Sequence, residues 1–259
     1  MKLNKLIAIA TISLLSGGIS MAQKALNLED IVAGNIIQTK GIGSMTWLKD
    51  GERYSRLENN KQTGGTDIVA YRAKDNSREV IIPSSLLTDK STGRPIPVRS
   101  VSWSADNEKV LIYNNTRRVW RYDTRGDYWV LNLKDGALRQ LGKGMPESSM
   151  MFAKFSPDGT RVAYVSNNNI YVEDIDSGKI TQLTKDGSDT IVNGTFDWVY
   201  EEEFSCRDGF RWSPDGKHIA YWQSDTKGTG VFDIINNVDS IYAKVIHFPS
   251  PRQEPPIQP

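Results

Sequence analysis

The hydrophobic pattern of the chain is dominated by an aromatic residue followed by a short polar turn, which recurs at intervals of about 55 residues. The four copies read WLKDG at 47–51, WSADN at 103–107, FSPDG at 155–159 and WSPDG at 212–216. Pro or its substitute at the second position of the turn and Gly or Asn at the fourth are typical of a tight turn between two strands. The repeat therefore predicts a chain of short antiparallel strands.

The third repeat shows most clearly what one unit contains. Its apolar, strand-favouring segments are 151–155, 162–165, 170–174 and 180–183, and polar turns separate them. This pattern predicts a four-stranded antiparallel meander of about 50 residues. One such sheet cannot bury both of its faces alone, and radial packing of neighbouring sheets gives a β-propeller. We therefore expect an all-β chain with about four propeller blades, the last incomplete. A β-sandwich built from the same strands is the alternative.

Two insertions interrupt the repeat. Comparison with the third repeat places about 10 extra residues between the second and third strands of repeat two. They include cationic and aromatic side chains, namely Arg117, Arg118, Trp120, Arg121 and Arg125. A second insertion of about 15 residues precedes Trp212 and contains DWVYEEEF at 197–204. Binding residues concentrate in long insertions on a rigid scaffold, so both are candidate parts of a site.

The acidic insertion is suited to binding a cation. Its aromatic residues Trp198, Tyr200 and Phe204 would hold the adjacent glutamates against a blade and withdraw them in part from water. The alternative is structural: Glu201–Glu203 would form a solvated helical turn, and the arginines of the other insertion would neutralise it. Residue types alone leave both interpretations open.

Composition narrows the class of protein. The 259 residues, of which 38% are hydrophobic, suffice for one large domain or two small ones with a filled core. The 32 basic and 31 acidic side chains are interspersed, which gives no basic face for nucleic acid. Cys206 is the single cysteine, so the chain can form neither an intrachain disulfide nor a Cys-rich metal site. We expect Cys206 to pack as a small apolar side chain, and we expect no cofactor.

The two ends of the chain differ from the repeats between them. Residues 1–22 combine Lys2 and Lys5 with an apolar run and small residues up to Ala22, which predicts a secretory signal peptide. The mature protein is then expected in the periplasm or outside the cell, and an uncleaved N-terminal membrane anchor is the alternative. Residues 249–259 are Pro-rich and polar and are expected to form a disordered tail. The propeller region accordingly spans residues 23–248.

Residues 195–222, TFDWVYEEEFSCRDGFRWSPDGKHIAYW, resemble the substrate-anchoring segment of the dipeptidyl peptidase IV group in the prolyl oligopeptidase family of serine peptidases. The DWVYEEE string carries the match, and a weaker likeness extends over about residues 26–242. The resemblance implies an eight-bladed propeller that covers a C-terminal α/β-hydrolase domain. It also implies release of dipeptides from peptide N-termini when the second residue is Pro or Ala, and it allows a homodimer. This chain would supply the N-terminal part of that propeller.

The same resemblance assigns substrate-binding roles to three residues. Glu202 and Glu203 match the paired glutamates that bind the free α-ammonium of a peptide, and Arg121, in the pair Trp120-Arg121, matches the arginine that contacts a substrate carbonyl. An α-amino group has a pKa of about 7.7–8.0, so it is largely charged at neutral pH and can donate three hydrogen bonds. No role is implied for the other arginines of this insertion, Arg117, Arg118 and Arg125.

The sequence departs from the family pattern where catalysis is concerned. No Gly-x-Ser-x-Gly nucleophile elbow occurs, and the nearest string, at 18–22, falls in the expected signal peptide. The two histidines, His218 and His247, lack the context of a catalytic triad. We therefore expect no catalytic residue and no peptidase activity in this chain, and the triad in a hydrolase domain that this sequence lacks. A non-enzymatic periplasmic propeller that binds proteins and a non-functional truncated remnant are the alternatives.

Overall fold

The computed structural model describes residues 43–119, 121–236 and 244–250, together with Asn27, Leu28, Val32 and Gly41. The side chains of 231–236 and 244–250 are not among those described. The chain divides into two units, Met1–Ile42 and Gly43–Pro259, and every element named below lies in the second. The expected signal peptide at 1–22 lies outside the described residues. No helix among the residues described has the length and apolar character needed to cross a membrane.

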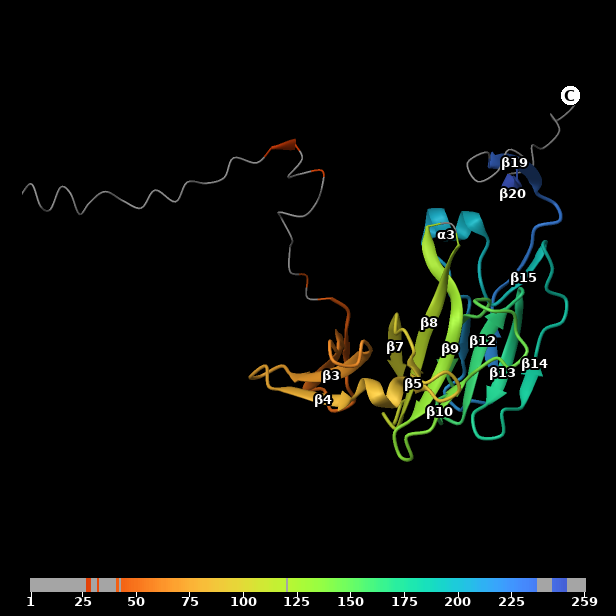
Figure 1. Cartoon of the computed structure of the whole chain (residues 1–259). Helices are drawn as coiled ribbons and strands as arrows, with labels where there is room; N and C mark the ends of the chain where they lie inside the picture. The colour runs from red at the N-terminus through yellow and green to blue at the C-terminus, as the bar shows by residue number, and fades with distance from the viewer. Residues whose placement is uncertain are drawn as a thin grey trace, which may run out of the picture. The chain divides into compact units, whose positions relative to one another are not determined.

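Three consecutive four-stranded antiparallel sheets form the body of the second unit (Figure 1). The first sheet contains β1 (Met45–Trp47), β2 (Arg53–Asn59), β3 (Thr66–Arg72) and β4 (Arg78–Ile82). The second contains β7 (Ser100–Trp103), β8 (Lys109–Val119), β9 (Tyr122–Asn132) and β10 (Leu138–Gln140). The third contains β11 (Met151–Phe155), β12 (Arg161–Ser166), β13 (Asn169–Asp174) and β14 (Ile180–Gln182). In each sheet the strands pair in chain order, which confirms the predicted meanders.

The connection between the first two sheets carries the short helix η1 (Ser84–Leu87) and the two-stranded pair β5 (Thr88–Asp89) and β6 (Arg94–Pro95). Leu87 and Ile96 from this connection enter the core between the two sheets. The segment therefore fills the space between blades rather than forming a surface loop.

The repeated polar turn has one structure in its successive copies. In the third sheet the hydroxyl of Ser156 donates to Asp158 at 2.5 Å, and the amide of Gly159 donates to the Ser156 carbonyl at 2.9 Å. The hydroxyl holds the pKa of Asp158 down to about 2. Gly159 has a φ of +68°, and Asn107 adopts a φ of +60° at the same place in the second sheet. Gly or Asn is required there because few other residues tolerate this backbone region.

Two of the repeated aromatic residues, Trp103 and Trp212, connect successive sheets through their indole N–H groups. The indole of Trp103 on β7 donates to Ser55 on β2 at 3.3 Å. That of Trp212 on the later strand β16 (Phe210–Trp212) donates to the carbonyl of Lys154 on β11, also at 3.3 Å. A Trp that buries its ring and still satisfies its N–H suits such a contact. At the third repeat the ring of Phe155, which has no N–H, packs against the apolar cluster between sheets two and three.

Three apolar clusters lie between successive sheets. The first joins sheets one and two through Ile68, Ile82, Val110, Ile112 and Leu131. The second joins sheets two and three through Leu111, Tyr128, Val130, Val162 and Tyr164. The third joins sheet three to the strands that follow β14, which correspond to the fourth sequence repeat and are called the fourth unit below. Its members are Met151, Ala163, Val165, Ile170 and Phe210. Each large apolar side chain buried in this way contributes about 1.5–3 kcal/mol. Sheets that pack face to face in series are propeller blades, so the predicted fold class is confirmed.

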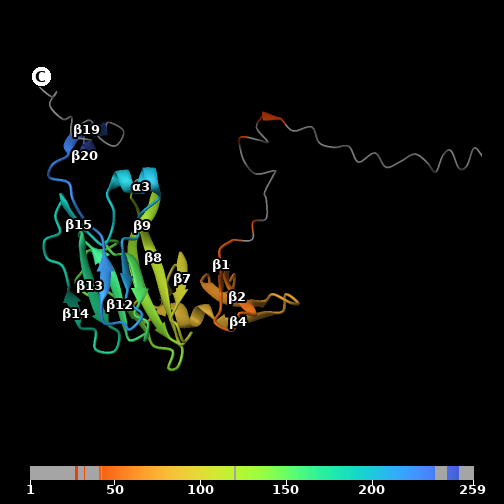
Figure 2. The same ribbon diagram turned by 180° about the vertical axis from the view of Figure 1, so that it is seen from behind.

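The fourth unit is divided into separate strand pairs. β16 pairs with β17 (Ile219–Tyr221), and β15 (Ile191–Asn193) pairs with β18 (Gln223–Asp225). β19 (Gly230–Asn236) pairs with β20 (Lys244–Ser250). Figure 2 shows the strands β15, β19 and β20 of this unit. β20 extends two residues into the segment expected to be a tail, since Pro249 and Ser250 are paired with β19. Residues 251–259 lie outside the described part of the chain.

Candidate functional site

The cationic insertion is an extension of a hairpin. β8 and β9 continue beyond the other strands of the second sheet and remain paired as far as Val119 and Tyr122, with register shifts after Asn114 and Arg117. Arg121 lies in the turn that directly precedes β9. The extra residues of repeat two therefore lengthen two paired strands, which carry Arg121 well beyond the sheet.

The acidic insertion contains one short helix, α3 (Trp198–Phe204). Asp197 caps its first turn by accepting a hydrogen bond from the Tyr200 amide at 3.1 Å, as N-cap aspartates do. The helix ends at Ser205, whose φ of 54° is left-handed, and the Cys206 amide donates to the Tyr200 carbonyl at 3.0 Å. An antiparallel bridge between Thr195 and Asp208 closes the base of the insertion. The acidic segment is thus an inserted helix whose flanking segments are joined at its base.

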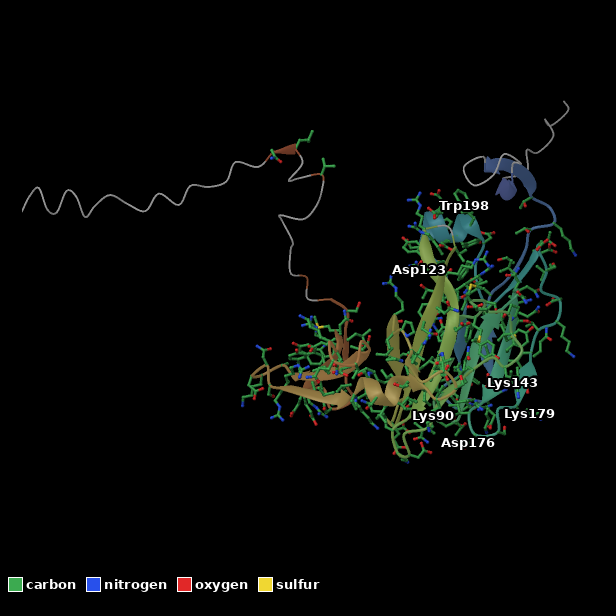
Figure 3. All side chains as sticks on the ribbon, viewed as in Figure 1. Lys90, Asp123, Lys143, Asp176, Lys179 and Trp198 are labelled. Carbon is green, nitrogen blue, oxygen red and sulfur yellow. The ribbon has the colours of Figure 1, made fainter. Side chains whose placement is uncertain are left out.

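Figures 1 and 2 both show α3 beside the tip of the β8–β9 hairpin. Figure 3 shows Trp198 of α3 and Asp123 of β9 at this end of the sheets, and Lys90, Lys143, Asp176 and Lys179 at the opposite end. The two insertions predicted from the repeat therefore meet at one end of the blades.

Aromatic contacts hold α3 on the fourth unit. The ring of Phe196 lies 5.5 Å from that of Tyr200 and 6.0 Å from that of Trp222, and Tyr200 lies 5.6 Å from Phe204. The expectation that aromatic residues fix the acidic segment is confirmed for Tyr200, whereas Phe204 remains 65% exposed. The anchor on the blade is Phe196 with Trp222, which sequence reasoning missed. Only the spacing of Tyr200 and Phe204 was a usable signal, because residues four apart are neighbours on a helix and Phe196 precedes the N-cap Asp197.

The three adjacent glutamates have three different environments. Glu201 is buried at 8% exposure, and its Oε1 has no hydrogen-bond partner among the described residues. The side chain of Glu202 is 9% exposed, and its Oε1 is likewise buried without a partner in the part of the chain that is described. Glu203 is exposed. Burial raises the pKa of Glu201, the cation of Arg207 opposes this rise, and the charge of Glu202 adds to it.

Arg121 and Glu202 form an ion pair across the two insertions. The Nε of Arg121 lies 2.6 Å from the Oε2 of Glu202, although the arginine side chain is 75% exposed. The structural alternative is therefore correct in two respects: the acidic segment is helical, and an arginine of the hairpin neutralises one glutamate. It is wrong in a third, because Glu201 and Glu202 are withdrawn from water. Glu203, the third predicted site residue, lies next to the pair on the exposed side of α3.

A cavity of about 900 Å³ adjoins the ion pair. It is lined by residues that flank the site on both insertions, with additions from β11 and the fourth unit: Tyr122, Asp123, Phe152, Phe196, Arg207 and Trp222. Arg121, Glu202 and Glu203 do not line it themselves. The guanidinium of Arg207 lies 3.7 Å from the centre of the Tyr122 ring, a contact that the sequence did not reveal.

The acids on the cavity wall already have cationic partners. Asp123 pairs with Arg99 at 3.4 Å, and Asp208 pairs with Arg211 at 2.9 Å and with Lys154 at 2.5 Å. Burial lowers the pKa of Lys154 to about 8 despite that partner. The buried carboxylate oxygens without a partner among the described residues, Oε1 of Glu201 and Oε1 of Glu202, both belong to α3. The described residues contain no cluster of three or more His, Cys, Asp or Glu arranged to hold a metal ion.

The fold and the site geometry together define a propeller region in which an arginine of one blade insertion pairs with a glutamate of the other. The chain belongs to the family described as the dipeptidyl peptidase IV N-terminal region, whose model matches residues 104–257. This membership confirms the resemblance identified from the DWVYEEE string.

Two relatives and one solved structure place the chain further. It is 36% identical over 135 residues to the probable dipeptidyl-aminopeptidase B of Chaetomium globosum, covering 52% of this chain and 15% of that protein. It is 28% identical over 220 residues to the Aspergillus terreus protein of the same description, covering 81% and 24%. The crystal structure of Porphyromonas gingivalis dipeptidyl peptidase 4 matches with a TM-score of 0.73 at 24% identity, over 88% of this chain and 31% of the other, which shows a common fold. The chain therefore spans a quarter or less of these curated relatives.

Proposed function

We propose that this chain forms the part of a dipeptidyl peptidase IV-type serine exopeptidase that anchors the free N-terminus of a peptide substrate. In this proposal Glu202 and Glu203 bind the α-ammonium group, and Arg121 binds a backbone carbonyl of the same peptide. Membership of the family supports the class of protein. Hydrolysis by the whole protein, and its preference for Pro or Ala at the second position, belong to the same proposal.

The observation that carries the proposal is the unpartnered Oε1 of Glu202. A buried carboxylate oxygen without a hydrogen-bond donor is costly, and such groups in native proteins call for an explanation. A peptide ammonium supplies both a positive charge and three donors. It could satisfy Glu202 and reach the exposed carboxylate of Glu203 next to it. Each charge-assisted hydrogen bond of this kind is worth roughly 1.5–3 kcal/mol.

The second half of the proposal concerns the remaining donors of Arg121. A guanidinium has five N–H groups, and the contact with Glu202 at 2.6 Å uses the Nε. The side chain is largely exposed, so its other donors can face a ligand. An arginine that neutralises Glu202 and also donates to a carbonyl would place the first peptide group at a fixed distance from the ammonium. Such a fixed distance would define the position of each peptide bond relative to the N-terminus of the bound peptide.

The test is peptide binding to the full chain. We expect a Gly-Pro peptide with a free amine to bind about 10- to 100-fold more tightly than its N-acetylated form, as measured by NMR titration. Glu202→Gln and Glu203→Gln should each remove most of this preference, because an amide carries no charge to attract the ammonium.

The matched control is Glu52→Gln, which changes an exposed glutamate on the first sheet and should leave the preference intact. Equal affinity of the unmodified chain for free and acetylated peptides would contradict the proposed anchoring role. So would full retention of the preference in both site variants.

A further inference from the structure

We propose that Arg207 and Tyr122 act as positioning residues, forming a clasp that holds the tip of the β8–β9 hairpin on the α3 insertion and thereby keeps Arg121 beside Glu202. The clasp means the stacked contact between these two side chains. This inference rests on the proposed function, since the groups that the clasp positions are those proposed to bind the peptide N-terminus.

The geometry places one half of the clasp on each insertion. Tyr122 is the first residue of β9 and directly follows Arg121. Arg207 follows α3, where its carbonyl accepts a hydrogen bond from the Thr195 hydroxyl at 3.0 Å. The guanidinium of Arg207 lies 3.7 Å from the centre of the Tyr122 ring. The backbone of Arg207 is therefore fixed at the closed base of the insertion, and its side chain reaches across to the hairpin.

The Arg121–Glu202 pair needs such support. The Arg121 side chain is 75% exposed although that of Glu202 is only 9% exposed, and an ion pair that water reaches in this way biases a conformational equilibrium by a factor of about 5 or less. A cation–π contact at such a site contributes roughly a further 2- to 30-fold. Because Arg121 and Tyr122 are adjacent, ordering one also orders the other, so the second contact forms at little additional entropic cost. The two contacts together fix the hairpin tip more firmly than either alone.

The surroundings of Arg207 favour this role over an ordinary surface ion pair. Among the described residues no carboxylate lies within 4.0 Å of its side chain, whereas Arg99 and Arg211 on the same cavity wall are both paired with aspartates. Its positive charge instead lowers the pKa of the buried Glu201, against the larger effect of burial. The Tyr122 ring is the side-chain contact of the guanidinium that the described residues show.

The experiment measures the order of Arg121 in the full chain directly. The Nε–H of Arg121 should be rigid by ¹⁵N relaxation in the unmodified protein and should become mobile in Arg207→Ala and in Tyr122→Leu. Tyr122→Phe keeps the ring and should keep Arg121 rigid. Arg94→Ala removes an exposed arginine of β6, away from both insertions, and serves as the matched control, with no change expected.

The second measurement is the preference for a free-amine over an acetylated Gly-Pro peptide. It should fall roughly 2- to 30-fold in Arg207→Ala and Tyr122→Leu and remain unchanged in Tyr122→Phe and Arg94→Ala. Thermal melting of each variant shows whether the fold is intact. Should Arg207→Ala fail to fold, Tyr122→Leu decides the matter, because Tyr122 is 46% exposed at the hairpin tip and supports no core.

The outcomes separate the clasp from the anchoring role. An Arg121 that stays rigid in Arg207→Ala and Tyr122→Leu overturns the clasp, whatever the peptide affinities are. An unmodified chain that does not distinguish free from acetylated peptide overturns the anchoring role, while the relaxation data still judge the clasp. A loss of Arg121 order in Tyr122→Phe as large as that in Tyr122→Leu would also overturn the clasp, because the proposed contact uses the ring and not the hydroxyl.

Discussion

Two buried glutamates show how differently the blades and the insertions treat a carboxylate. Glu173, on β13 between the second and third sheets, is 2% exposed and accepts hydrogen bonds from Arg139 at 3.0 Å, the Gly142 amide at 2.8 Å and the Tyr164 hydroxyl at 3.3 Å. Glu202, on α3, is almost as buried but has one partner and one empty oxygen. The same side chain is fully satisfied in the blade and only half satisfied in the insertion.

The difference indicates what each carboxylate does. Buried charges are tolerated where partners compensate for the lost hydration, and the Glu173 network provides this with donors from three strands or turns. A structural role needs no further ligand. Glu202 and its neighbour Glu201 instead each retain one buried oxygen without a partner among the described residues, which calls for an explanation. The proposed binding of a peptide ammonium supplies that explanation, whereas burial alone would not distinguish Glu202 from Glu173.

The largest expected effect comes from removing the satisfied carboxylate. Glu173→Ala should lower the free energy of unfolding by about 3 kcal/mol, because it leaves the Arg139 cation and the Gly142 amide between two blades without their acceptor. Urea denaturation of the full chain measures this. The control is Glu108→Ala, which removes a more exposed ion pair with Lys134 and should cost less than about 1 kcal/mol. Similar losses in the two variants would contradict a structural role for Glu173.

Hydrogen exchange should reveal the same contrast in the backbone. The central strand β12 carries Ala163 and Val165, which are fully buried between sheets, so its amides should exchange only on global unfolding. α3 has seven residues and one cap at each end, and it can open without disturbing a blade. We expect the amides of Glu201 and Cys206 to exchange at least about 100-fold faster than those of β12. Equal protection would mean that α3 belongs to the cooperative core.

The parts of this structure that could be predicted from sequence are those with a local, repeated cause. The turn chemistry at 156–159 and the alternation of strands around it specify a meander, and repeating that unit specifies packed blades. The insertions could be located by comparing one repeat with another. That the cationic insertion would extend β8 and β9, and would meet α3, could not be foreseen, because nothing local determines how far a hairpin projects.

The site was predictable only where a motif named its residues. The resemblance singled out Arg121, Glu202 and Glu203, and the structure brings the first two together. It gave no reason to single out Phe196, Trp222, Tyr122 or Arg207, whose contacts depend on segments far apart in the sequence. Nor could it show that Glu201, the first glutamate of the string, is buried while Glu203 is exposed. The rotation of a seven-residue helix is set by its aromatic anchors, which are tertiary contacts.

The smallest change in stability is expected on substituting Glu201, and it tests most directly whether the blade and α3 treat buried carboxylates differently. Because burial raises its pKa, the folded protein binds a proton there more readily than the unfolded chain does. The charged form therefore destabilises the fold at neutral pH, and Glu201→Gln should raise the free energy of unfolding by about 1 kcal/mol. The stabilisation should be small near the usual pKa of 4.5, grow as the pH rises through the folded pKa, and then level off. Thermal melting of the variant and the unmodified chain across this range measures it. A variant that is less stable at neutral pH would contradict this, because it would mean that the fold depends on the Glu201 carboxylate.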